Sequence, residues 1–349
     1  MDMKRSYYED VQLFTSGVVV FWFVALLLFL GLLPFLFKNY YVYVANYMAI
    51  NVIVALGLNL LVGYTGQISL GHAGFFAIGA YGTVILMTLL RCPFLLALLA
   101  AALIAALFGF FLGLPALRLE GPYLAIATLG FGLTITQVIG RSEFFGGRQG
   151  LHTPELWVGP WHLTTDRDFY YLLIPITVML TVAARNLIKT RVGRAFIAIR
   201  EADIAAATMG VNLVFYKTLA FAVSAFYAGV GGGLYAFVLR FIEPEIFTLL
   251  MSIMFLAMVI VGGIGSIMGS IVGACLLSWM DLQLRNILSI PYLGDWLETL
   301  SQSYFSITGV SNIQYIVFGL ILILIMLFEP LGILGIWLRT KRYWKTWPF

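Results

Sequence analysis

Long apolar runs, separated by short polar segments, dominate the hydrophobic pattern of this chain. Most runs approach the length of about 20 residues that a helix needs to cross a bilayer. The runs are continuous, so they favour transmembrane helices over the alternating strands of a membrane barrel. We therefore predict an all-α, polytopic membrane bundle that forms a single domain over residues 1–349, with about ten transmembrane helices. The predicted spans are 17–37, 42–62, 73–90, 93–115, 122–140, 169–188, 218–239, 246–262, 267–283 and 313–336.

The composition of the chain is that of an integral membrane protein. The chain is 62% hydrophobic and 10% charged, whereas soluble domains carry about 25% charged residues. Cys92 and Cys275 lie far apart in sequence and suggest neither a disulfide framework nor a metal site. The net charge of +4 gives no sign of nucleic-acid binding, because the distribution of the basic residues along the chain follows the predicted membrane topology. About two thirds of them fall in segments predicted to be cytoplasmic, with both termini on that side.

One apolar run is interrupted by glycines and small polar residues between residues 63 and 82. Glycine permits both a helix break and close helix packing. We expect the helix to unwind at residues 64–67 and a new helix to begin near Ser69, which would cap it. Unwound backbone at membrane depth is tolerated only beside a cavity or inside protein. Residues 63–72 are therefore predicted to be a discontinuous element at a translocation pathway or its inner gate.

A second segment, residues 121–132, has the same character on a smaller scale. Pro122 is suited to starting a helix, and small residues follow along it. Lining of a pathway and simple close packing both account for this pattern. The candidate pathway residues in the two segments are Gly63, Tyr64, Thr65, Gly66, Gln67, Ser69, Gly71, His72, Thr128 and Gly130.

His72 has three interpretations, namely a hydrogen-bonded residue that fixes helix packing, a pathway contact or a proton relay. The absence of a carboxylate nearby in sequence disfavours the relay. Gln67 and Ser69 share the first two alternatives, because polar residues inside membranes serve both as functional groups and as links between helices.

The glycine-rich pattern has an echo in the second half of the chain. Val62-Gly63-x-x-Gly66-x-Ile68 matches Val261-Gly262-x-x-Gly265-x-Ile267 at a constant offset, and Gly74 then falls opposite Gly273. A true internal repeat and a chance match in a glycine-rich chain both explain it. Short segments interrupted by glycine in both halves of a transporter are a pointer to its transport site.

The polar segment at residues 193–212 is amphipathic, with alanines on its apolar face and a stop at Gly210. Alanine suits docking into a protein groove better than insertion into lipid headgroups. We therefore predict a cytoplasmic coupling helix, which requires a separate motor. The chain has no G-x-x-x-x-G-K-[ST] phosphate loop, so ATP would be bound and hydrolysed by partner subunits, and the chain itself is neither an enzyme nor a cofactor-binding protein.

Two other classes of function are less well supported. An ion-coupled secondary carrier usually has paired charged residues in its spans, which are not evident here. An intramembrane enzyme that uses Ser69 and His72 would lack the G-x-S-x-G turn that commonly presents a nucleophile.

Five ordered blocks of sequence resemble the LivM-type permeases of branched-chain amino acid ABC importers. The resemblance extends from about Tyr40 to Arg339. The blocks read NLLVGYTGQISLGHAGFFAIGAYG, GLPALRLEGPYLAIATLGFG, GRAFIAIREADIAAATMGVNLVFYKTLAFAVSAFYAGVGGGLYA, VIVGGIGSIMGSIVGA and FEPLGILGI.

The resemblance implies a permease subunit in a bacterial inner membrane, surrounded by lipid and without a nucleic-acid partner. Its implied partners are a LivH-type sister permease, two cytoplasmic ABC ATPases and a periplasmic solute-binding protein. The residues implied to dock an ATPase are Arg194, Arg200, Glu201, Asp203, Ala205, Ala206 and Gly210.

One loop departs from the family pattern. The family usually has T-G-G-x-N-G-L after the fifth span, whereas this chain has Phe144-Phe145-Gly146-Gly147-Arg148-Gln149-Gly150-Leu151. Trp157 and Trp161 add aromatic residues nearby. Since urea and short-amide importers resemble the same permeases, such a substrate is the alternative to a branched-chain amino acid.

Overall fold

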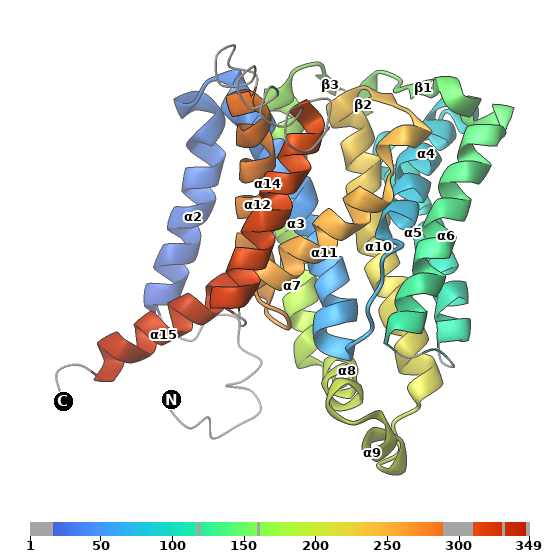
Figure 1. The fold of residues 1–349 in the computed structure, drawn as a ribbon. Helices are drawn as coiled ribbons and strands as arrows, with labels where there is room; N and C mark the ends of the chain where they lie inside the picture. Colours follow the sequence, from blue (N-terminus) through green and yellow to red (C-terminus); the bar gives the residue numbers. More distant parts are fainter. Residues whose placement is uncertain are drawn as a thin grey trace, which may run out of the picture.

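The computed structural model describes residues 17–116, 119, 121–158, 161–288, 310–329 and 332–346. These residues form a bundle of helices with two small antiparallel sheets, β1–β4 and β2–β3, of which β1, β2 and β3 are seen at one end (Figure 1). The predicted all-α membrane bundle is confirmed. The helices are α2 (Gly17–Leu36), α3 (Asn39–Thr65), α4 (His72–Leu90), α5 (Phe94–Ala116), α6 (Pro122–Arg141), α7 (Asp166–Lys189), α8 (Arg191–Glu201), α9 (Asp203–Thr208), α10 (Leu213–Leu239), α11 (Leu249–Gly262), α12 (Ile267–Leu288), α14 (Val310–Phe328) and α15 (Gly332–Thr346).

Short elements connect the helices at one end of the bundle. The strands are β1 (Leu151–His152), β2 (Leu156–Val158), β3 (Trp161–Leu163) and β4 (Phe241–Ile242), and the 3-10 turns are η1 (Glu143–Phe145), η2 (Gly147–Gln149) and η3 (Pro244–Ile246). We call this end the hairpin end, after the β2–β3 pair. The opposite end carries α8 and α9, together with α15 and the lower end of α2, and is called the coupling end (Figure 1).

Seven helices within the described residues are long and apolar enough to cross a membrane, namely α3, α4, α5, α6, α7, α10 and α12. Helix α11 has 14 residues. At 1.5 Å per residue it is about 21 Å long, shorter than a hydrocarbon core of about 30 Å. The helix alone is therefore shorter than a full span, and the span at residues 246–262 stays a prediction.

Helices α3 and α10 lie at the centre of the bundle. Both are apolar, and most of their residues are buried against α4, α5, α7 and α12. Small residues bring the backbones close, as at Gly79 of α4, where an added Cβ would overlap the Gly229 carbonyl of α10. The end of α3, up to Thr65, is therefore placed in packed protein.

The last predicted span, residues 313–336, is two helices in the structure. Helix α14 ends at Phe328, and α15 begins at Gly332, which has a φ of +70°. The sequence between them contains Pro330, which lacks the N–H needed to continue a helix. An ion pair of 2.9 Å between Arg339 and Glu329 connects the two sides of this interruption.

The predicted coupling helix at residues 193–212 is also two helices, α8 and α9. Ala202 interrupts them with extended backbone, at φ −163° and ψ 99°. Alanines alone predict a continuous helix, so the interruption reflects tertiary packing at the coupling end. There Asp203 forms an ion pair of 3.3 Å with Lys217 of α10.

Candidate functional site

The first break in the bundle is the non-helical segment between α3 and α4, residues 66–71, which we call the first break. Gly66 closes α3 with a left-handed φ of 72°. Its N–H donates to the Val62 carbonyl at 3.2 Å, and the Gln67 N–H donates to the Leu61 carbonyl at 3.2 Å. The chain then runs back into the bundle, so α4 begins inside it (Figure 1). The predicted discontinuity is confirmed, but α4 begins at His72 and is preceded by Gly71, not capped by Ser69.

Helix α6 holds the upper half of the first break. The Thr128 hydroxyl accepts a hydrogen bond from the Leu70 N–H at 3.0 Å and donates one to the Ala125 carbonyl at 2.9 Å. A Cβ on Gly71 would overlap the Thr128 carbonyl oxygen. Gly71 therefore permits the break to lie directly against α6, where a side-chain hydroxyl satisfies one of its backbone donors.

His72 is enclosed at the beginning of α4. Its side chain is fully buried, with Nδ1 3.0 Å from the Ser69 Oγ and Nε2 2.7 Å from the Ser224 Oγ of α10. The next residue, Ala73, donates its N–H to the Ser252 Oγ of α11 at 2.9 Å. Both ring nitrogens are thus occupied within the chain, which favours the packing interpretation of this histidine over a pathway contact.

The second break, residues 263–266, separates α11 from α12. Gly265 has a φ of 78°, close to that of Gly66, which is its counterpart in the sequence echo. Asn59 of α3 forms two hydrogen bonds to this turn. Its Oδ1 accepts from the Gly265 N–H at 2.9 Å, and its Nδ2 donates to the Ser266 carbonyl at 3.0 Å. Asn59 is 1% exposed. One buried amide therefore gives the Gly265 N–H its partner and adds a donor to the Ser266 carbonyl, which also accepts from the Ser270 N–H at 3.0 Å.

Arg200, near the end of α8, contacts both breaks. Its Nη1 donates to the Gly63 carbonyl of α3 at 2.6 Å. An added Cβ at Gly265 would lie 2.7 Å from the same nitrogen, and one at Gly66 would lie 3.6 Å from the Arg200 Cγ. A charged donor to a carbonyl is among the stronger protein hydrogen bonds. Arg200 thus connects the coupling end to the first break and to the second break.

The predicted pathway residues do not all gather together. Those on α3 and in the first break, with Thr128, form one cluster, and most of their side chains are buried. Gly66 is exposed. Gly130 lies apart from the cluster, because it is exposed on α6 and an added Cβ would meet nothing within 4 Å. Thr128 and Gly130 therefore differ in their surroundings although they are neighbours on one helix.

The predicted coupling residues divide into two groups. Ala206 is buried and Asp203 is paired with Lys217, so both fasten α9 to the bundle. The others are exposed at the coupling end, and Gly210 has a φ of 86°. The exposed members are Arg194, Arg200, Glu201, Ala205 and Gly210.

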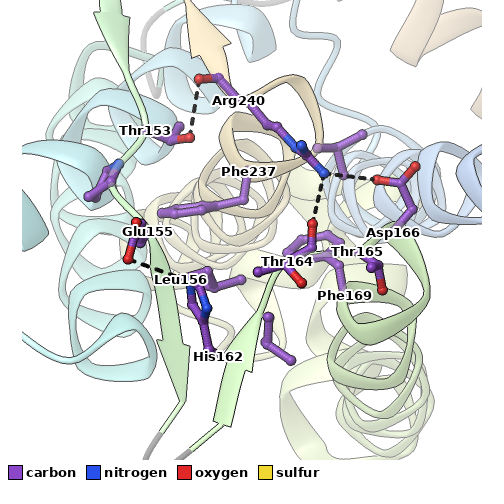
Figure 2. A pocket seen from close by; sticks show the side chains of 13 residues that line it. Thr153, Glu155, Leu156, His162, Thr164, Thr165, Asp166, Phe169, Phe237 and Arg240 are labelled. Carbon is purple, nitrogen blue, oxygen red and sulfur yellow. Dashed lines mark hydrogen bonds and ion pairs between the residues drawn. The ribbon is translucent and has the colours of Figure 1, made fainter.

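A cavity of about 300 Å³, lined by both polar and apolar residues, lies at the hairpin end (Figure 2). Arg240, at the end of α10, crosses it and donates to the Thr164 carbonyl at 3.0 Å, with the Asp166 carboxylate at 3.7 Å. Glu155, just before β2, and His162 of β3 face each other at 3.5 Å. Arg240 has a φ of 62°, a conformation that is uncommon for a residue other than glycine. Sequence reasoning did not predict this cavity.

Sequence reasoning also missed Asn59, Ser224 and Ser252. Asn59 carried a usable signal, because an amide in the middle of an apolar span needs a partner. The two serines gave no such signal in the sequence, since serine in a membrane helix often bonds to its own helix. Only the packing of α10 and α11 against α4 assigns them to His72 and Ala73.

The fold and this arrangement define a class of protein, a multi-pass helical membrane protein with interrupted helices at its centre. The family model of the branched-chain amino acid transport system, permease component, matches residues 40–326. The chain therefore belongs to that family.

Individual relatives agree with this membership. The chain is 37% identical over 279 residues to the high-affinity branched-chain amino acid transport system permease protein LivM of Escherichia coli (strain K12), a match that covers 73% of this chain and 66% of that protein. LivM of Salmonella typhimurium gives the same values. LivH of Salmonella typhimurium is 25% identical over 303 residues, covering 81% of this chain and 90% of LivH. The match thus spans just under two thirds of the length of the LivM relatives. No solved structure matches the chain significantly.

Proposed function

We propose that this chain is a translocation subunit of an ATP-driven importer for branched-chain amino acids in a bacterial inner membrane. It works with a LivH-type sister permease, two cytoplasmic ATPases and a periplasmic solute-binding protein. Family membership and the names of the relatives support the substrate and the partners. ATP hydrolysis belongs to the ATPases, and this chain supplies part of the pathway.

The observation that carries the mechanism is the contact of Arg200 with both breaks. Its bond to the Gly63 carbonyl joins α8 to the end of α3, and its guanidinium lies against Gly265. A displacement of α8 would therefore move the ends of two interrupted helices together. Packed elements shift between discrete arrangements and do not deform continuously. We infer that this is how ATPase closure opens and closes the pathway beside the first break.

The coupling end is the cytoplasmic end in this proposal. Several basic residues lie there, including Arg191 and Arg194 on α8 and Arg339 on α15, which agrees with the positive-inside rule. Both termini of the chain are then cytoplasmic. The hairpin end faces the periplasm.

The surface that docks an ATPase differs from the alanine face expected from the pattern. Ala195 and Ala206 are buried against the bundle. On the other side, Ile204 is 79% exposed and Met209 is 85% exposed. Exposed apolar side chains rimmed by polar residues mark protein contacts. The docking surface is therefore the exposed side of α9, with Glu201 and Gly210 at its edges.

The β2–β3 hairpin is the corresponding contact for the solute-binding protein. Trp157 is 49% exposed and Trp161 is 72% exposed. Tryptophan is enriched at protein interfaces, because it buries a large apolar area and keeps a hydrogen-bond donor. These residues fit the edge of a docked periplasmic partner.

The test is reconstitution of the four-component importer in liposomes, followed by ATP-dependent uptake of L-leucine. We expect uptake that requires both ATP and the binding protein. Glu201→Gln and Gly210→Ala should leave assembly intact and hydrolysis active while uptake falls.

Three results would contradict the proposal. Uptake of urea without leucine would replace the substrate by a small amide. Gradient-driven uptake by the chain alone would indicate a secondary carrier. No ATP-driven uptake of any solute would exclude the permease function.

A further inference from the structure

The coupling end contains a second cavity, of about 260 Å³, which we call the inner cavity. It lies between the first break, the beginning of α6 and the junction of α8 with α9. Cavities for drug-sized ligands span about 300–1,000 Å³. The inner cavity therefore suits a smaller solute.

Gln67 lines this cavity with a buried amide that lacks a partner. Its side chain is 6% exposed, and neither Nε2 nor Oε1 has a hydrogen-bond partner among the described residues. Buried polar groups in native proteins are nearly always hydrogen-bonded, and an exception needs an explanation. A polar solute in the inner cavity would satisfy one or both of these atoms.

The inner cavity offers both signs of charge to a ligand. Lys217 and Asp203 form an ion pair of 3.3 Å and so largely neutralise each other. Arg200 uses Nη1 for the Gly63 carbonyl and has other N–H donors. The exposed Glu201 carboxylate forms no ion pair with the described residues. One cation and one anion thus remain for a zwitterion.

The remaining wall is apolar and is made by Leu119, Leu124 and Ile199. A small solute that matches this lining carries a carboxylate, an ammonium group and an apolar side chain. We propose that the inner cavity binds an α-amino acid with an apolar side chain from the cytoplasmic side. Its carboxylate is held by Arg200 and the Gln67 amide, its ammonium group by Glu201, and its side chain by the apolar wall.

This assignment rests on the proposed function for its orientation in the membrane, and it adds a consequence. The bound carboxylate and the Gly63 carbonyl share the donors of Arg200, which connects α8 to both breaks. Occupancy places a second acceptor on the same guanidinium, which competes with the Gly63 carbonyl and weakens that connection. We expect amino acid accumulated in the cytoplasm to slow further import.

The experiment measures binding of tritiated L-leucine to the purified permease–ATPase complex, without ATP and without the binding protein. We expect saturable binding that Glu201→Gln and Gln67→Leu each weaken at least tenfold. Glu143→Gln, at the hairpin end, is the matched control and should bind as the wild type does. Isopentylamine lacks the carboxylate and 4-methylpentanoate lacks the ammonium group, so neither should displace leucine efficiently.

Two results would overturn the assignment. One is the absence of leucine binding to the wild-type complex. The other is binding that both variants retain or that isopentylamine displaces as well as leucine does, which would mean that the Gln67 amide meets only water. Gln67→Leu removes an unpartnered amide, and Glu201 is exposed, so both variants are expected to assemble, which gel filtration checks. Leucine uptake by the full importer, measured in parallel, separates failure of this site from failure of the proposed function.

Discussion

The two breaks begin from similar sequence and differ in how they are held. Gly66 and Gly265 both have left-handed φ values, of 72° and 78°. The second break is a short turn, and the single amide of Asn59 forms hydrogen bonds to two of its backbone groups. The first break is longer and runs back into the bundle (Figure 1). It leaves the Gln67 amide without a partner among the described residues. The comparison indicates that the second break is fixed and that the first break is adjustable.

The difference has a physical cause in the neighbours of each break. Helices α11 and α12 pack directly on each other, since a Cβ on Gly262 would overlap the Gly269 carbonyl. Helices α3 and α4 instead each pack against α10, and α6 supports the chain of the first break through Thr128. A local glycine signal therefore permits a break, and the packing around it decides whether the break is a tight turn.

The largest effect is expected from Asn59→Leu, which removes the support of the second break. It leaves the Gly265 N–H without a partner, at about 1–3 kcal/mol, and it removes one of three donors to the Ser266 carbonyl, at about 0.5–1.5 kcal/mol. Thermal unfolding of the purified complex measures the loss. Thr134→Val is the control, because the Thr134 hydroxyl bonds only to its own helix at 2.8 Å. Equal stability of the two variants would mean that the second break is not fixed by Asn59.

The next largest effect is expected from Gly71→Ala in the first break. The new Cβ would overlap the Thr128 carbonyl, and such overpacking costs about 1–3 kcal/mol. Gly130→Ala adds the same atom where nothing lies within 4 Å, so it should be neutral. Thermal unfolding curves of both variants measure the difference in stability. If Gly71→Ala were as stable as Gly130→Ala, α6 would not hold the first break.

Arg200→Met tests the connection between the breaks. It keeps much of the apolar stem and removes the donor to the Gly63 carbonyl. We expect leucine uptake to fall about tenfold, equivalent to about 1.4 kcal/mol, while ATP hydrolysis continues. Arg148→Met, at the hairpin end, should transport normally. Parallel loss of hydrolysis and uptake would instead point to an ATPase docking defect.

The smallest effect is expected from substitution of Gly66, whose backbone is left-handed. Gly66→Ala should cost about 1 kcal/mol, because a Cβ disfavours a φ of 72°. Gly66→Asn should cost less, since asparagine tolerates that conformation better. Unfolding midpoints of the two variants measure the difference. If alanine were tolerated as well as asparagine, the backbone at Gly66 would be free to adopt another conformation, and the first break would be more adjustable than its geometry indicates.

Much of the fold followed from local sequence. The apolar runs predicted the helical bundle, and the glycines at residues 63–71 predicted the discontinuity close to where it lies. Boundaries were less accurate, because a glycine marks where a helix can end and not where the next begins. The alanine pattern at residues 193–212 predicted one helix, but the paired Asp203 and buried Ala206 hold two.

The candidate site could be predicted only in part. The polar residues of the first break stood out because they interrupt an apolar run. Gly130 stood out equally, yet it is exposed and apart from the cluster. The cavity at the hairpin end gave no signal, because Arg240 and Asp166 are ordinary surface residues until the fold places them together.

By itself, the sequence determined that this chain is embedded in a membrane, because that depends on composition. It also determined that the chain forms helices and that one helix is interrupted at the centre of the bundle, because these features depend on periodicity and on the positions of glycine. Only the tertiary structure decided which polar groups meet. His72 and Ser224 are 152 residues apart, and Arg200 and Gly63 are 137 apart. Such pairs arise because a buried polar group must find a partner wherever helix packing brings one. No local pattern specifies that partner.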